Sequence, residues 1–585
     1  MIKLKVILDT ISQKYFEGAS LLMKLTTNMP FKLWITAFLF LTECMYALPV
    51  IRQIEDITRY QDQQNIYEEQ SKERRSETAI YTELSAIPLS RESNVSQACI
   101  QIESIDTEGI TLIDKEELEV LIQPYLHRCD SMEDINTLVK KINNIYIQKA
   151  YVTSRAYIKP QDLSKEHLEI VAMEGKVEKI SGSNISTVLV FPTMEGEILD
   201  LRDLEMGLEQ LNRLQSVEAT MQINPGDEEG FSKIVIIGKK MGSVLHGNLG
   251  VNNYGTKKSG RYQFSGSVGW DDPLGINDLL TVNLNTTDKQ SNDNNSIGNS
   301  ISYALPVGRS YLEISYFRFD YDQIVNGLNR DYQSKGDTET FQIKTEYKLF
   351  HSKEQKGKFD ISLLRKKNDN YLEDVFLDTS SNKLTILRFS YTHHYAAPTW
   401  DGYVTLRYLR GLEWFGARAA ALTDPTFNKY TLDMSYNKGI NSKGIPTFYN
   451  FSFYGQYAKK GIVGSEQIGI GGPYSVRGFT SEGQISGNKG FYVRNELAFV
   501  QRFEKGTLSP YLGLDYGVVT HNDESYGGHI LGLTFGSRFN FYDCLLDLSY
   551  SLPVIDSNRV IYRANGDVIH KTNSPFSGFS LLYRF

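Results

Sequence analysis

The stretch HILGLTFGSRFNF, residues 529–541, decides the fold because apolar and polar side chains alternate along it. Successive side chains of an extended strand point to opposite faces. One face here is apolar and the other is small, polar or charged. The two sets are Leu531, Leu533, Phe535, Phe539 and Phe541 against Gly532, Thr534, Gly536, Arg538 and Asn540. This pattern is typical of a membrane-embedded barrel with an apolar outer wall and a polar lumen.

The same alternation recurs through the last 345 residues, for example in TFYNFSFYGQY, residues 447–457. Sixteen such segments begin near residues 243, 261, 278, 299, 310, 339, 357, 383, 400, 429, 446, 489, 508, 528, 543 and 577. A soluble sandwich also alternates, but its polar face need not surround a lumen. The pattern predicts an all-β transmembrane barrel of sixteen antiparallel strands over residues 241–585.

The connections between these segments support a barrel of the outer-membrane type. Long connections follow odd-numbered strands, and short turns such as DPLGIN, PVGR and EKGT follow even-numbered ones. The long ones include 323–338, 369–382, 461–488 and 553–576. Long external loops and short periplasmic turns are the bacterial outer-membrane arrangement, so we expect that membrane's lipid around the barrel. The last strand ends in Phe585, a terminal aromatic of the kind that outer-membrane barrels present to the barrel-assembly machinery.

The N-terminal region has the pattern of an export signal. Basic residues precede the apolar run LWITAFLFL (33–41), and Ala47 occupies a cleavage position, so residues 1–47 are predicted to be a signal peptide. Translation from Met29 would give a signal of conventional length. Residues 48–72 form a weakly amphipathic helix, with a solvated, frayed terminus as the alternative, and residues 73–96 resemble a linker.

Residues 97–240 have the composition of two small α+β modules. The first module, residues 97–176, and the second, residues 177–240, are each predicted as a β-α-α-β-β unit. Ser131 and Asp134 have the spacing of a capping box at the start of the longest helix. Cys99 and Cys129 lie in the first module, and in an exported protein we expect them to form a disulfide; two buried thiols are the alternative.

The sequence gives no indication of an enzyme. It contains no HExxH, GxSxG, P-loop or CxxC motif. His393 and His394 are neighbours on a predicted strand and point to opposite faces, so joint metal binding is not expected. We expect no catalytic residue, metal or cofactor. The net charge of −8 gives no global basic field, so nucleic acid is not expected as a partner.

The long connection 461–488 contains glycines on both sides of an arginine, in the sequence GIGGPYSVRGF. An unpaired arginine is costly to bury, so a solvated surface arginine is the alternative to a buried, paired one. The segment SVRGF resembles the VRG(Y/F) signature in the sixth extracellular loop of the outer-membrane translocase superfamily. Residues 128–163 and 199–216 resemble the two POTRA motifs of the two-partner secretion transporters, the TpsB (ShlB/FhaC/HecB-like) family.

This resemblance implies that Val476, Arg477, Gly478 and Phe479 form a loop motif folded into the barrel. In that family the arginine pairs with an aspartate in a GxDxG strand motif, and GLDYG at 513–517 matches it. Strand parity independently puts Gly513, Asp515 and Gly517 on the lumenal face. The same parity puts Arg494 and Glu496 beside Asp515 on the preceding strand.

The resemblance further implies a function in type Vb secretion. The POTRA domains would bind an unfolded exoprotein through its N-terminal secretion domain, and the N-terminal helix would plug the idle pore. The exoprotein would be an adhesin, a haemolysin or a contact-dependent toxin. We expect a monomer in the outer membrane of a Gram-negative cell, with its POTRA domains in the periplasm. An outer-membrane assembly insertase and a passive porin are the alternatives.

Overall fold

The computed structural model describes most of the chain after residue 53. The described residues are 54–74, 82, 84–88, 99–289, 294–326, 330–419, 423–442, 444–480, 484–520, 527–556, 560–562, 568–570 and 575–585. The predicted signal peptide and Met29 lie outside them, as does most of the predicted linker. Among the described residues, no helix combines the length and apolarity needed to cross a bilayer.

The first module is a three-stranded sheet covered by two helices. Its elements are β1 (Ile100–Ile102), β2 (Ser104–Glu108), α3 (Lys115–Ile122), β3 (Arg128–Asp130), α4 (Met132–Gln148), β4 (Arg155–Tyr157) and β5 (His167–Met173). The sheet has the order β2-β5-β4, and β1 pairs separately with β3. Ser131 and Asp134 form the predicted capping box of α4. The apolar stripe of α4 is fully buried in the module core, at Ile135, Leu138, Ile142 and Tyr146.

The second module has one helix where the sequence predicted two. Its elements are β6 (Lys176–Ser183), α5 (Leu201–Leu211), β7 (Val217–Pro225) and β8 (Phe231–Lys240), with the sheet order β6-β8-β7. Residues 184–200 form turns, which Pro192 and Gly196 favour. Phe191 packs in the core against Gly207 of α5, where a Cβ atom would overlap its ring. The segment between β6 and α5 thus contributes the side chain of Phe191, rather than a second helix, to the core of the module.

The remainder of the chain forms a closed barrel, as predicted. Its sixteen principal strands are β9 (Leu245–Asn252), β10 (Gln263–Asp271), β11 (Leu279–Thr287), β12 (Asn295–Val307), β13 (Ser310–Asn326), β14 (Asp331–His351), β15 (Gln355–Leu372), β17 (Asn382–Ala397), β18 (Trp400–Leu412), β19 (Asn428–Ser442), β20 (Ile445–Ala458), β23 (Lys489–Phe499), β25 (Gly506–Val519), β26 (Gly528–Phe541), β27 (Cys544–Asp556) and β30 (Phe576–Arg584). Each pairs antiparallel with its neighbours. Short strands β16 (Val375–Phe376) and β24 (Gln501–Phe503) extend two of the hairpins.

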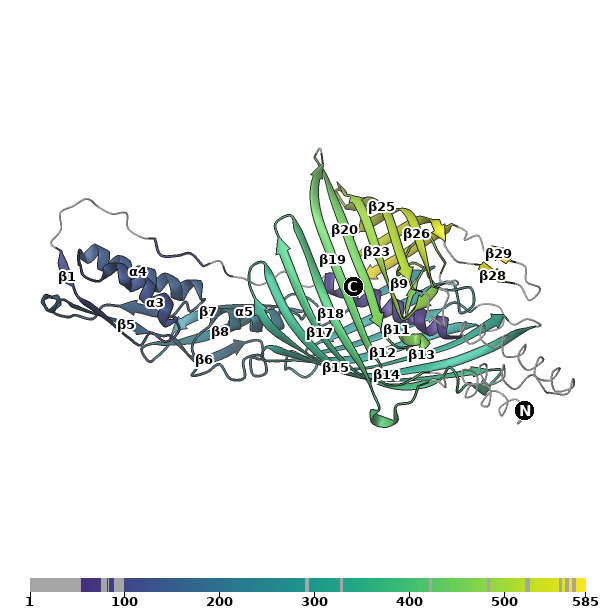
Figure 1. The fold of residues 1–585 in the computed structure, drawn as a ribbon, viewed down its shortest axis with the longest axis horizontal. Helices are drawn as coiled ribbons and strands as arrows, with labels where there is room; N and C mark the ends of the chain where they lie inside the picture. Colours follow the sequence, from purple (N-terminus) through teal and green to yellow (C-terminus); the bar gives the residue numbers. More distant parts are fainter. Residues whose placement is uncertain are drawn as a thin grey trace, which may run out of the picture.

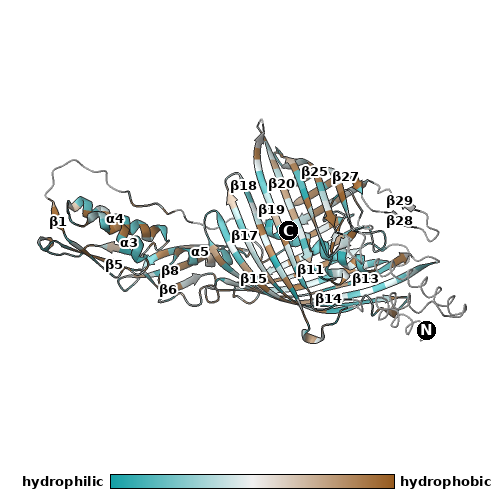
Figure 2. Ribbon diagram, viewed as in Figure 1, coloured by the Kyte–Doolittle hydropathy of each residue, from teal (hydrophilic) through white to brown (hydrophobic). Residues whose placement is uncertain are grey.

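The strand faces agree with the alternation in the sequence. Phe535, Phe539 and Phe541 are exposed on the outer wall, whereas Thr534 is fully buried inside. Figure 2 shows hydrophobic and hydrophilic residues interspersed along the strands. The sixteen-stranded fold is therefore confirmed.

The strands on one side of the barrel are longer than predicted. The interval 323–338 was expected to be a loop, but β13 continues to Asn326 and β14 begins at Asp331. The interval 369–382 is also shortened, because β15 continues to Leu372 and β16 follows it. The residues of these extensions are mostly polar or charged, for example Asn326, Asp331 and Lys335, so they lack the regular apolar face by which strands were recognised.

The barrel closes where β30 meets β9. Ser580–Arg584 pair with Asn252–Asn248, and reciprocal backbone bonds of 2.9 and 3.0 Å join Phe585 to Gly247. The second module contacts the end of the barrel that carries the short turns. Gly308 in one turn donates to the Leu189 carbonyl at 2.8 Å, and Arg213 donates to the Asn277 carbonyl at 2.9 Å.

Residues 54–74 form a helix inside the barrel, drawn in dark purple in Figure 1. Ile54 and Ile57 are buried against Tyr321 and Leu377 of the barrel wall. Gln70, further along the helix, donates to Asp433 at 3.0 Å. The N-terminal helix is confirmed, and the alternative of a solvated, frayed terminus is wrong because the polar lumen supplies partners for its polar side chains.

Candidate functional site

The connection between β20 and β23 lies inside the barrel. It contains the short hairpin β21 (Ile468–Ile470) and β22 (Ile485–Gly487). Val476 and Phe479 of the loop motif are fully buried in an apolar cluster with Ile530 of the wall. Ile66 of the N-terminal helix packs against the same cluster. Loop and helix therefore share one small core inside the lumen.

Arg477 is the polar centre of this loop. Its Nε and Nη2 donate to the two carboxylate oxygens of Asp515 at 2.6 and 2.8 Å, and its backbone N–H donates to the same carboxylate at 3.0 Å. Asp515 is fully buried and Arg477 is 8% exposed. The solvated-surface alternative for this arginine is therefore wrong. A bidentate, charge-assisted pair is the geometry that offsets the lost hydration of a guanidinium.

The two residues predicted beside Asp515 also contact the loop. Glu496 accepts from Nη1 of Arg477 at 2.8 Å, so the guanidinium bonds to two carboxylates. Arg494 donates to the Pro473 carbonyl at 3.1 Å and lies 5.2 Å from the ring centre of Tyr67 on the helix. On β23, Glu496 thus contacts the loop, and Arg494 contacts both the loop and the helix.

The glycines of the two motifs make room for this contact. The Arg477 guanidinium covers Gly513 so closely that a Cβ atom would overlap it. A Cβ at Gly517 would lie 2.9 Å from the Val476 methyl carbon. Gly478 adopts φ of +102° and would place a Cβ 2.5 Å from the Leu552 carbonyl oxygen. In the GxDxG motif, the aspartate therefore pairs with Arg477, and the glycine on each side of it leaves space for the loop.

Arg538, already expected on the lumenal face, and two further residues, Tyr511 and Asp547, complete the network. Arg538 on β26 donates to Glu496 at 2.5 and 2.9 Å and to Asp547 on β27 at 3.0 Å. Its guanidinium lies 4.2 Å from the ring centre of Tyr511, whose hydroxyl donates to Asp547 at 2.8 Å. Arg538 was recognised as lumenal, but parity carries no information about which lumenal charges meet.

A second ionic contact holds the beginning of the loop. Glu466 accepts from Lys366 of β15 at 2.8 Å and from Lys429 of β19. Lys366 also bonds to Asp62 of the helix at 3.0 Å. This cluster was not predicted, because strand parity indicates that the two lysines point inward but not which carboxylates they contact. It links the loop and the helix to strands β15 and β19 of the wall.

The helix itself faces a basic strip of the inner wall. Glu69 lies 3.4 Å from both Arg388 and Arg407. Glu73 accepts from Lys358 at 2.8 Å and contacts His394 at 3.1 Å. The acidic face of the helix and the strands β15, β17 and β18 are thus complementary in charge.

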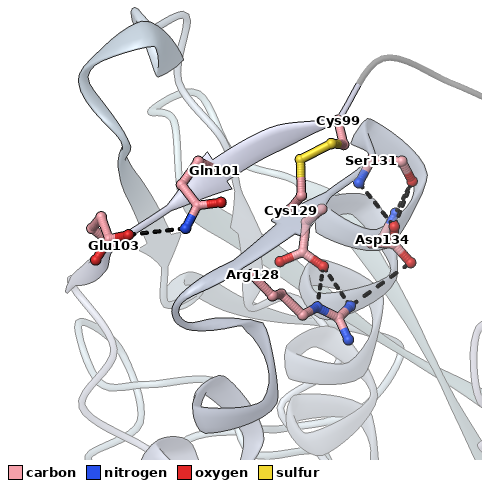
Figure 3. The surroundings of a disulfide bond; sticks show 8 residues. Cys99, Gln101, Glu103, Arg128, Cys129, Ser131 and Asp134 are labelled. Carbon is pink, nitrogen blue, oxygen red and sulfur yellow. Dashed lines mark hydrogen bonds and ion pairs between the residues drawn. A yellow bond between two sulfur atoms is a disulfide. The ribbon is translucent and has the colours of Figure 1, made fainter.

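The remaining predicted residues lie far from the loop. Cys99 and Cys129 form a disulfide between β1 and β3, beside the ion pair of Arg128 with Asp130 (Figure 3). Phe585 lies on the outer surface of the barrel seam, next to Tyr583. His394 points to the helix, whereas His393 contacts Phe350. Among the described residues, no three potential metal ligands come together.

Comparison with protein families matches all three parts of the chain. Residues 230–539 match the family of haemolysin secretion/activation proteins ShlB/FhaC/HecB. Residues 100–175 match the ShlB-type POTRA domain, and residues 168–225 match a further POTRA domain model.

Individual relatives agree with this assignment. The outer membrane transporter CdiB of Dickeya dadantii is 32% identical over 447 residues, which cover 75% of this chain and 79% of the relative. The haemolysin transporter protein HpmB of Proteus mirabilis is 30% identical over 493 residues, 82% of this chain and 84% of the relative. The solved structure of CdiB from Escherichia coli superposes with a TM-score of 0.78 at 27% identity, covering 91% of this chain and 99% of that one. The chain belongs to the ShlB/FhaC/HecB family and is an outer-membrane transporter of two-partner secretion, with its POTRA domains in the periplasm.

Proposed function

We propose that this transporter exports one dedicated exoprotein and that the structure corresponds to its closed, resting state. The observation that carries the proposal is the set of bonds between Arg477 and the two carboxylates of Asp515 and Glu496. They hold the motif Val476–Phe479 against the wall, in the path of a passing polypeptide. The helix packs on the same loop through Ile66. Opening the pore then requires both segments to leave.

The exoprotein enters as an unfolded chain through the POTRA domains. Strand β7 is an edge strand of the second POTRA sheet and pairs only with β8 among the described residues. Its outward-facing residues Glu218 and Thr220 are exposed. An edge of this kind can accept an extended segment by strand addition, which tolerates a moving and varying sequence.

The exoprotein is an adhesin, a haemolysin or a contact-dependent toxin. The haemolysin transporter names of relatives such as HpmB support the haemolysin among these three. Folding of the exoprotein outside the cell drives its movement, and the transporter acts as a monomer without nucleotide. Phe585 serves as the signal to the barrel-assembly machinery during biogenesis.

A passive porin fits the lumen poorly. A porin conducts constitutively, whereas here the helix and the loop occupy the lumen and share buried contacts. This observation favours a gated transporter over the porin alternative.

Hydrogen exchange of the full-length chain tests the entry step. Adding the N-terminal secretion domain of the exoprotein should slow amide exchange in Val217–Pro225 of β7. Exchange in the first-module strand β4 serves as the internal reference, and replacing the secretion domain with a folded protein of similar size is the control. Unchanged exchange in β7, with binding still detected, would mean that the cargo binds elsewhere.

A further inference from the structure

The lipid-facing wall carries a shallow groove of about 600 Å³ on strands β15 to β23. Its lining includes Tyr408, Tyr430, Leu432, Gly455, Tyr457 and Phe491. Gly455 stands in register between Leu432 and Phe491, so the row of outward side chains is interrupted there. The interruption leaves a hollow between aromatic walls, within the usual size range of small-ligand pockets.

The groove lies toward the extracellular side of the barrel. Tyr408, Tyr430 and Tyr457 are in register with one another and form its upper border. Tyr457 lies one residue before the end of β20, where the loop that carries Arg477 begins. The POTRA domains contact the opposite end of the barrel. The groove therefore faces the outer leaflet of the membrane.

Three basic residues stand around this upper border. Arg410 is two residues beyond Tyr408 on β18, about 7 Å further along the strand, and Lys459 is two residues beyond Tyr457, just past the end of β20. Lys489 is in register with Tyr457, and its ammonium lies 4.9 Å from the ring centre. Arg410 and Lys459 are exposed. The arrangement puts positive charge directly above an apolar hollow.

The Arg410 side chain is oriented by neutral groups. Asn428, its partner in register on β19, accepts from Nη1 of Arg410 at 2.8 Å and from the Tyr408 hydroxyl at 2.7 Å. In the described part of the chain, no carboxylate oxygen lies within 4.0 Å of the three cations around the groove. Their charge is thus available to an external anion.

Basic residues elsewhere on the outer rim differ in this respect. Arg318 forms ion pairs with Asp320 and Glu339 at 2.8 and 3.3 Å. Lys335 pairs with Asp374 at 3.2 Å, and Lys367 pairs with Asp369 at 2.6 Å. These residues lie on the outer face of β13, β14 and β15, and their charges are paired within the protein. Unlike Arg318, Lys335 and Lys367, the three cations above the groove have no carboxylate partner in the described part of the chain.

We infer that this face is a binding site for an outer-leaflet glycolipid with a phosphorylated head group. Arg410, Lys459 and Lys489 would bind the phosphates, because guanidinium and ammonium groups form strong charge-assisted bonds with phosphate oxygens. An acyl chain would lie in the hollow over Gly455, between Leu432 and Phe491. Since β20 leads directly into the loop 461–488, the bound lipid would contact the strand that carries this loop.

The test measures lipid binding to the full-length, detergent-purified transporter by native mass spectrometry. The probes are rough lipopolysaccharide, the same glycolipid after removal of its phosphates, and phosphatidylglycerol. The intact glycolipid should bind at least roughly tenfold more tightly than its dephosphorylated form, since charged hydrogen bonds are lost with the phosphates. The R410A/K459A/K489A variant should lose this preference. Heat-modifiable migration on gels checks that each variant retains a folded barrel.

Two further variants test the phosphate contacts and the acyl-chain groove separately. R318A/K335A/K367A removes the same number of rim cations from ion-paired positions and should bind the glycolipid like the unmodified transporter. Gly455→Leu fills the hollow, and the Phe453 ring beside it is a side-chain end that can turn away. It should weaken both forms of the glycolipid equally.

Three results would overturn the inference. The first is equal glycolipid binding by the unmodified transporter and R410A/K459A/K489A. The second is an equal loss in R318A/K335A/K367A, which would indicate a general effect of rim charge. The third is phosphatidylglycerol binding as tightly as the glycolipid, which would reject a glycolipid as the occupant.

Discussion

The backbone carbonyl of Arg477 lies directly over the α-carbon of Gly532, so closely that a Cβ atom at position 532 would overlap the carbonyl oxygen. Replacing Gly532 with Ala should therefore displace the loop from the wall, at a cost of about 1–3 kcal/mol typical of overpacking. We expect higher pore conductance in planar bilayers. Gly298→Ala is the matched control, because the nearest atom to its Cβ would be 3.6 Å away. Equal conductance of the two variants would mean that the loop tolerates the shift.

Arg477→Ala should sharply reduce secretion while leaving a folded barrel. Breaking a buried ion pair from one side typically costs about 3–5 kcal/mol, because the partner charge remains buried. Asp515→Ala should have a similar effect, and the double variant should be little worse than either single one. Lys at position 477 should rescue poorly, since an ammonium cannot form the bidentate contact. Secreted exoprotein in the medium, relative to barrel in the membrane, is the measurement. Additive losses would show that the two residues act separately.

Deleting residues 54–74 should raise the conductance and make the pore anion-selective. The helix supplies the carboxylates of Glu69 and Glu73, so without it Arg388, Arg407 and Lys358 line the lumen without those partners. The reversal potential in a potassium chloride gradient measures the selectivity. Glu69→Gln, which keeps the helix, should leave the conductance low. A cation-selective or unchanged pore after the deletion would contradict the charge assignment of the wall.

The disulfide between Cys99 and Cys129 should stabilise the first POTRA domain. Closing a loop with a sequence separation of 30 residues contributes about 3–4 kcal/mol in the chain-entropy model. Mass spectrometry of non-reduced peptides should find the linked pair and a free Cys544. Replacing both cysteines with Ser should increase protease sensitivity of residues 97–176 but not of the barrel. Recovery of Cys99 as a free thiol would refute the pairing.

The contact of the second POTRA domain with the barrel should depend on pH through Glu209. Burial alone would raise the pKa of Glu209, but Lys348, Lys356 and His351 around it outweigh burial and lower its pKa. A lowered pKa in the docked state means that the contact is fully stabilised above the carboxyl's ordinary pKa. This stabilisation is lost as the pH falls through the lower, docked value.

Glu209→Gln should therefore weaken docking at neutral pH by about 1.5–3 kcal/mol, the range for hydrogen bonds to charged groups. Proteolysis at residues 241–244, between β8 and β9, would report the loosened junction. The difference from the unmodified chain should shrink at acidic pH. A difference that persists at low pH would assign the effect to packing rather than to charge.

Much of the loop contact could be predicted because strand parity is a local property. Asp515, Glu496 and Arg494 were assigned to the lumen from the apolar residues beside them, and the resemblance supplied their partner. Strand parity tells whether a residue lies on the inner or the outer face of the barrel wall. It tells neither its position along the barrel axis nor which residue it contacts across the lumen. Arg538 was therefore recognised as lumenal but not as the second partner of Glu496. Glu466 was missed because its lysine partners lie on strands distant in sequence.

The limits of the strands were predictable only where lipid imposes an apolar face. At their outer ends β13 and β14 continue with mostly polar residues, and the buried Val325 packs against the N-terminal helix rather than facing lipid. Gly532 was read as a small lumenal residue, and nothing local marks it as the residue beneath Arg477. In both cases, the strand extensions and the contact of Gly532, the structure depends on residues from other parts of the chain, which the local sequence does not indicate.

The contacts of Arg477 are made by β23, β25 and β26, with β27 bonded to Arg538 behind them. All of these strands follow the loop in the chain, whereas the lysine partners of Glu466 lie on β15 and β19, which precede it. The loop therefore joins earlier and later strands of the wall through buried charges. The binding site of Arg477 is complete only when β23, β25 and β26 are paired with one another.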